Sequence, residues 1–137
     1  MKKVIIDTNL WISFLIGHQT QLVRRLLTDF RFDVYVCPQL LEEIRNVAGR
    51  EKFSRWISPA DIEDLMAIIH AFCQYVIIDT HAPASAIRDP KDLYLLSLAE
   101  TIDADYIVSG DADLTDLETY HQTRIVKLAD FKQMMQH

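Results

Sequence analysis

The sequence has few of the residues that bend a chain or tie it together: three glycines, four prolines and two cysteines among 137 residues. So few glycines and prolines argue against long linkers and low-complexity tails, and we expect a single domain over residues 1–137. The two cysteines, Cys37 and Cys73, do not suggest a disulfide framework, because each stands where an apolar residue would fit. We therefore expect buried free thiols and a reducing compartment.

Long apolar runs are also missing. The run Val4–Ile6 follows two lysines, but Asp7 interrupts it after three residues, which is too short for a signal peptide. No later stretch approaches the length of a membrane span, so we expect a cytoplasmic protein with no membrane association. The formal charge of −6 argues against attraction of the whole surface to nucleic acid, although acids that hold a metal ion count as negative here.

What the sequence does contain is an alternation of short β-branched runs and helical segments. Strands are expected at residues 4–6, 34–37, 75–78, 106–108 and 124–126. Helices are expected at residues 10–16, 20–29, 38–47, 91–102, between about 59 and 73, and from about 128 onward. This alternation predicts an α/β fold with right-handed crossovers and a parallel sheet covered on both faces.

Four acidic residues stand where such a fold could bring them together. Asp7 and Asp111 follow expected strands, Glu43 lies on the helix after the second strand, and Asp92 opens the helix after a proline-containing loop. Ligands of open α/β sheets bind beyond the carboxyl ends of the strands, near the point where the strand order reverses. We therefore expect these four side chains to share one cleft.

A cleft lined by carboxylates has a particular chemistry. Two carboxylates about 4 Å apart repel by roughly 4 kcal/mol at an effective dielectric near 20. Either some acids take up protons or a cation occupies the cleft, and oxygen ligands without His or Cys clusters suit Mg²⁺ or Mn²⁺. Such an ion would activate water and polarise a phosphoryl oxygen, which predicts phosphodiester hydrolysis. The side chains expected to support the four acids are those of Thr8, Asn9, Asp89, Ser109 and Asp113.

The motifs around these acids resemble those of the PIN-domain family. The motifs are Ile5-Ile6-Asp7-Thr8-Asn9, the segment Pro38–Ile44 with Glu43, Arg88-Asp89-Pro90-Lys91-Asp92, and the segment Asp105–Leu114 with Asp111. They occur in family order and at family spacing along the whole chain, and they look most like the VapC-type toxin ribonucleases of prokaryotic toxin–antitoxin systems. Two positions depart from the family pattern: Leu93, where a polar residue is common, and Thr115, where a second leucine is common.

The resemblance implies a Rossmann-like three-layer sandwich with a central parallel sheet of four to five strands flanked by helices. It also implies an endoribonuclease that acts on RNA, with Mg²⁺ or Mn²⁺ held by Asp7, Glu43, Asp92 and Asp111. The partners that it implies are an antitoxin protein and a second copy in a homodimer. The rival interpretation is a catalytically idle module of the same fold that binds RNA or an antitoxin.

Several residues compete with these assignments. Glu42 could be the ligand in place of Glu43. The segment Val76–Thr80 repeats Val4–Thr8 letter for letter, but Asp79 leads into a loop, and we interpret it as a turn residue. A basic set could contact RNA phosphates, with a solvated surface as the default interpretation. This set consists of Arg45, Arg50, Lys52 and Arg55.

Overall fold

The computed structural model describes residues 1–136, and within them the strands form one sheet in the order β3-β2-β1-β4-β6-β5. The strands are β1 Lys2–Ile6, β2 Phe32–Val36, β3 Gln74–Tyr75, β4 Tyr106–Val108, β5 Thr119–Tyr120 and β6 Thr123–Val126. Neighbouring strands pair in parallel except for β5, which runs antiparallel to β6. The sheet therefore has the mostly parallel order predicted from the alternating pattern, with one short antiparallel strand added at its edge.

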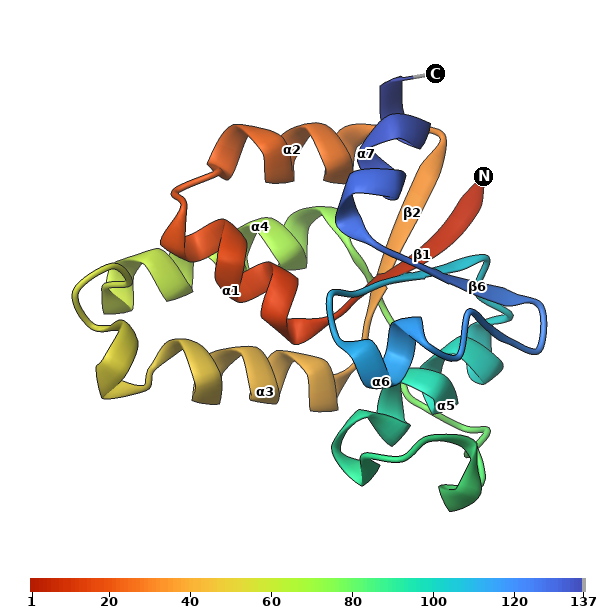
Figure 1. The fold of residues 1–137 in the computed structure, drawn as a ribbon. Helices are drawn as coiled ribbons and strands as arrows, with labels where there is room; N and C mark the ends of the chain where they lie inside the picture. Colours follow the sequence, from red (N-terminus) through yellow and green to blue (C-terminus); the bar gives the residue numbers. More distant parts are fainter. Residues whose placement is uncertain (137) are drawn as a thin grey trace.

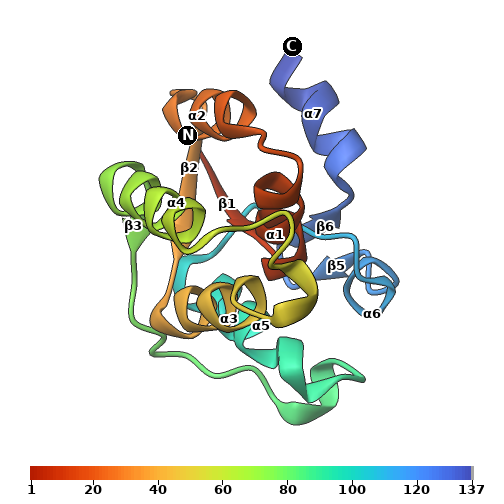
Figure 2. The same ribbon diagram turned by 90° about the vertical axis from the view of Figure 1, so that its left-hand side faces the viewer.

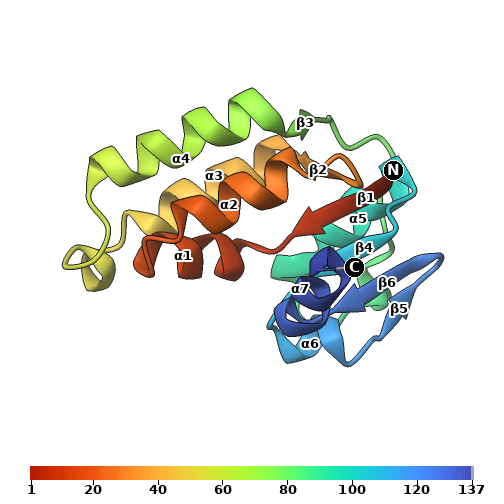
Figure 3. The ribbon, with the colours of Figure 1, turned by 90° about the horizontal axis from the view of Figure 1, so that it is seen from above.

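Helices cover both faces of this sheet. They are α1 Thr8–Ile16, α2 Thr20–Thr28, α3 Pro38–Ala48, α4 Pro59–Phe72, α5 Leu93–Ile102, α6 Ala112–Thr115 and α7 Leu128–Gln136. Three 3-10 turns, η1 Glu51–Phe53, η2 Ala84–Ala86 and η3 Pro90–Asp92, lie between them. Figures 1 and 3 show the sheet lying between α5 on one side and α7 on the other, whereas α1 to α4 pack against one another beside it. The predicted α/β fold with a helix-covered sheet is confirmed.

The core follows from the central strands. Val4, Ile5 and Ile6 of β1 are at most 1% exposed, because helices cover both faces of that strand. Trp11 of α1 is also buried, and its indole N–H donates to the carbonyl of Ile6 at 3.0 Å, so the first helix is fixed directly to the end of the first strand. Phe131 of α7 is fully buried and closes the other side of the core. No helix among the described residues is long and apolar enough to cross a membrane.

The segment that repeats the beginning of the chain does not form a second β1. The strand expected at residues 75–78 is only Gln74–Tyr75, and Ile77 is 63% exposed. The backbone N–H groups of Asp79 and Thr80 bind the hydroxyl of Thr101, near the carboxyl end of α5. Asp92 lies at the other end of that helix, so Asp79 is distant from the acids, as a turn residue would be.

Candidate active site

The strand order reverses between β1 and β4. From β1 the chain builds outward through β2 and β3, and it then returns to place β4 and β6 on the other side of β1. Asp7 follows β1 directly, and Asp111 comes three residues after the end of β4. Figure 1 shows α1 and α6 beginning next to the ends of these strands. Two of the four predicted acids therefore stand at the crevice where α/β sheets bind their ligands.

Ser109 joins these two acids. Its side chain is fully buried, and its hydroxyl donates to Oδ2 of Asp7 at 2.7 Å. The hydroxyl oxygen of Ser109 accepts the backbone N–H of Asp111 at 3.0 Å. Asp7 is itself only 3% exposed, and its backbone N–H donates to the carbonyl of Val108 at 3.0 Å. The ends of β1 and β4 are thus held together by hydrogen bonds that fix the Asp7 carboxylate.

Asp92 faces the same crevice from the start of α5. Its side chain is buried, and the pKa of Asp92 is raised to about 8, first by burial, then by hydrogen bonding to Asp111 and by the charges of Asp7, Asp111 and Asp89. Asp111 also caps α6, since its Oδ1 accepts the N–H of Asp113 at 3.0 Å. Burial favours the singly protonated form of this pair, in which Asp92 and Asp111 share one proton.

Glu43, on α3, is connected to the site by a hydrogen bond with a tyrosine. The hydroxyl of Tyr94, on the first turn of α5, donates to Oε2 of Glu43 and lies 3.2 Å from the hydroxyl of Thr8. Burial, followed by this bond, raises the pKa of Tyr94, so the phenol stays a donor. Glu42 is exposed, whereas Glu43 is half-buried, so the structure places Glu43 and not its neighbour at the site.

The charges of these acids act on one another. The pKa of Asp7 is raised by burial in the first place, while the hydrogen bonds from Ser109 and from the backbone of Thr8 act to lower it. The charges of Asp111 and Glu43 raise the pKa of Asp7 further. The structure therefore brings Glu43, Asp92 and Asp111 within electrostatic reach of Asp7.

The residues expected to support the acids divide into two groups. Thr8 and Ser109 are buried beside the acids, and their hydroxyl groups form hydrogen bonds with Tyr94 and Asp7, respectively. The other three lie at its border. Oδ1 of Asp89 accepts the N–H of Lys91 at 3.0 Å, Oδ1 of Asp113 lies 3.8 Å from Nε of Arg88, and Asn9 is exposed on α1. Sequence reasoning missed Tyr94, because its role depends on the distance between α3 and α5, which no local pattern shows.

The donor chemistry of the site fits a hard cation. Its candidate ligating atoms are carboxylate oxygens. Burial in the first place, and the charges of neighbouring acids in addition, raise the pKa values of Asp7 and Asp92, and a bound cation would offset both effects. The positions of the side chains are less convergent: within residues 1–136, no group of three or more His, Cys, Asp or Glu is arranged to hold a metal ion. Binding would therefore require carboxylate side chains to turn toward the ion.

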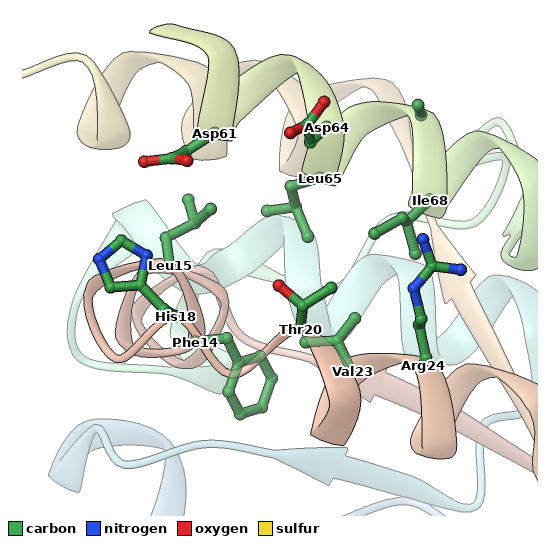
Figure 4. A pocket seen from close by; sticks show the side chains of 11 residues that line it. Phe14, Leu15, His18, Thr20, Val23, Arg24, Asp61, Asp64, Leu65 and Ile68 are labelled. Carbon is green, nitrogen blue, oxygen red and sulfur yellow. The ribbon is translucent and has the colours of Figure 1, made fainter. Parts of the chain in front are cut away.

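An open groove lies elsewhere on the molecule. A groove of about 390 Å³ runs between α1 and α2 on one side and α4 on the other. Figure 4 shows Leu15, Val23 and Leu65 on its walls, with Asp61 and Asp64 along the α4 rim. None of the four acids lines this groove, so it is a surface separate from the acidic crevice.

Comparisons with known proteins concern the family and the fold of the chain. A model of the PIN domain matches residues 3–113. Among solved structures, a chain from the crystal structure of VapBC2 from Rickettsia felis, bound to a DNA fragment from its promoter, superposes with a TM-score of 0.60. It is 11% identical, and the match covers 91% of this chain and 98% of that one, a likeness of fold. The PIN domain of RRP44 from T. brucei matches with a TM-score of 0.41 at 15% identity, covering 99% of this chain and 89% of that one. No curated protein sequence matches the chain.

Proposed function

The chain belongs to the PIN-domain family, and we propose on that basis that it is a divalent-metal-dependent endoribonuclease that hydrolyses phosphodiester bonds in RNA. The observation that carries the proposal is the buried Asp7 at the reversal point, joined to Asp111 through Ser109 and subject to the charge of Glu43. Burying a carboxylate among like charges lowers stability, and such sites are typical of catalysis and metal binding. The proposed catalytic residues of this enzyme are Asp7, Glu43, Asp92 and Asp111.

Each residue of the site has a definite task in this proposal. The four acids would hold Mg²⁺ or Mn²⁺, which when bound supplies activation of water and neutralisation of phosphate charge. Ser109 holds the Asp7 carboxylate in place through Oδ2. Tyr94 holds Glu43 through Oε2 in the same way. Without a cation, the acids repel the phosphates of RNA, so substrate binding and metal binding are coupled.

We also propose that this ribonuclease is the toxin of a toxin–antitoxin pair. The support is the resemblance of its four motifs to those of VapC-type toxins, together with a fold like that of the VapBC2 chain. On this proposal an antitoxin protein blocks the acidic crevice. A cytoplasmic location and a homodimer stay predictions.

Cleavage of labelled RNA by the purified full chain tests the enzymatic proposal. We expect cleavage with Mg²⁺ or Mn²⁺, none with a chelator, and none by the Asp7→Asn variant. Asp64→Asn is the matched control, because Asp64 is an exposed acid on α4 outside the crevice. RNA binding without cleavage would support the idle module instead.

A further inference from the structure

The turn between α3 and α4 concentrates positive charge on an acidic protein. Arg50, Lys52 and Arg55 are all exposed there, against a single acid, Glu51, while the whole chain has a formal charge of −6. Among residues 1–136, none of these three basic side chains forms an ion pair with a carboxylate. Arg45, one turn earlier on α3, differs, because it pairs with Glu63. The three charges of the turn are therefore available to a ligand.

Aromatic rings alternate with these charges. Nζ of Lys52 lies 5.0 Å from the centre of the Phe53 ring, and Cζ of Arg55 lies 5.6 Å from the centre of a ring of Trp56. Trp56 is 45% exposed, which is unusual for so large an apolar side chain. Surfaces that bind single-stranded nucleic acid combine basic side chains for the backbone with exposed rings on which bases stack.

Helix α3 connects this basic turn to the acidic crevice. Glu43 and Asn46 are three residues apart on α3, so they lie on one face of the helix. The helix ends at Ala48, and Arg50 follows in an extended conformation. A rise of about 1.5 Å per residue places Ala48, the last residue of α3, roughly 7.5 Å beyond Glu43 along the helix axis, and the basic turn begins two residues later, so a short single-stranded segment can span the distance. Asn46, between them, is exposed and uncharged. Figure 2 looks onto this end of the molecule and shows the yellow turn lying toward the viewer, following α3.

Resting on the proposed ribonuclease function, we propose that the basic turn, residues 50–56, binds the single-stranded RNA that flanks the cleaved bond. Arg50, Lys52 and Arg55 bind its phosphates, and Trp56 stacks on one of its bases. Single-stranded RNA is the ligand that fits, because in a duplex the base faces are already stacked and give an indole ring nothing to bind. The turn supplies the attraction for RNA that the acidic crevice and the net charge do not.

Salt-dependent binding tests the phosphate contacts. The probe is a fluorescent single-stranded oligoribonucleotide of mixed sequence, bound by the full chain carrying Asp7→Asn to prevent cleavage. Replacing Arg50, Lys52 and Arg55 by Gln should make the slope of log affinity against log salt shallower by roughly 2, since each phosphate contact with a single strand contributes about 0.7. A matched triple replacement on α2 and α7 removes the same charge elsewhere and should leave the slope unchanged. It consists of Arg24→Gln, Arg25→Gln and Lys132→Gln.

Two further variants test the stacking contact. Trp56→Ala should lose roughly tenfold in affinity for single strands without a change in the salt slope, and Trp56→Phe should recover part of that loss. Thermal unfolding of each variant checks that the turn still folds. Duplex RNA should bind more weakly than the single strand, with little response to Trp56→Ala.

The kinetics of RNA cleavage separate the failure of this inference from that of the enzymatic proposal. On the wild-type background, the basic-turn triple variant should raise KM and leave kcat near the wild-type value, whereas the matched triple changes neither. If the wild-type protein cleaves RNA but the two triple variants have the same KM and the same salt slope, the proposed binding of RNA by the basic turn is refuted. Binding of a protein partner would then be the alternative role for the turn. If no RNA is cleaved at all, the enzymatic proposal is what fails.

Discussion

Replacing Asp92 by asparagine should stabilise the metal-free protein, and the gain should grow with pH. In the folded protein the pKa of Asp92 is raised from 3.8 to about 8, so the native state binds this proton more tightly than the unfolded chain does. The stability that the proton contributes is fully present below pH 3.8 and is lost as the pH rises through the native pKa. An asparagine side chain keeps the shape and the hydrogen bonding of the protonated acid at every pH. The variant should therefore match the wild type in acid and exceed it at neutral and alkaline pH.

The size of the gain follows from the burial of Asp92 and from the charges around it. One pair of like charges about 4 Å apart costs roughly 4 kcal/mol at an effective dielectric near 20. Water at the half-buried Asp111 and Asp89 screens part of this repulsion. We therefore expect Asp92→Asn to raise the free energy of unfolding by about 1–3 kcal/mol at pH 8. For a chain of 137 residues this corresponds to a rise in Tm of roughly 3–10 °C.

Urea unfolding at a series of pH values between acid and alkaline, in the presence of a chelator, measures this gain. Asp64→Asn is the control, because it removes one negative charge from an exposed position on α4. Adding Mn²⁺ at pH 8 should stabilise the wild type more than Asp92→Asn, since the ion replaces the proton. A gain that is independent of pH, or equal to that of the control, would refute the argument that buried like charges destabilise this site.

The remaining predictions concern single side chains. Ser109→Ala leaves the Asp7 carboxylate without its buried donor and should cost about 1–3 kcal/mol in urea unfolding; an unchanged stability would contradict the linking role of Ser109. Tyr94→Phe frees Glu43 and should weaken Mn²⁺ binding, measured by calorimetry without RNA, by roughly tenfold. Equal affinity of the two proteins would show that Tyr94 only packs. Phe131→Ala removes a fully buried ring and should lower stability by about 3–5 kcal/mol while kcat at low temperature stays at the wild-type value.

Much of the fold was predictable from the sequence because the central strands are buried on both faces. Such strands appear as short apolar runs, and Val4–Ile6 and Tyr106–Val108 were both located in this way. The run Val76–Ile78 looks the same but does not continue β3. The reason lies in its partner: β2 ends at Val36, and Pro38 then begins α3, so no strand is left for Ile77 and Ile78 to pair with.

Only some residues of the candidate site could be predicted from local sequence patterns. Asp7 and Asp111 could be placed from the sequence, because each belongs to a segment that leaves a central strand. Glu43 and Asp92 depended on the resemblance to a family, since an acid on a helix is ordinarily a surface residue or a cap. Tyr94 was not predicted, because a tyrosine on the first turn of an apolar helix looks like a core residue until α3 is placed opposite it.

The sheet is bordered on each side by a strand of only two residues, β3 and β5. A foreign strand that approached either border would find at most a few backbone groups to bind before the chain turns away. Extended pairing between copies, the first step toward fibrils, needs a longer and flatter margin than this. The exposed Tyr75 and Ile77 therefore lie beside an open sheet edge that is too short to template extended pairing between copies.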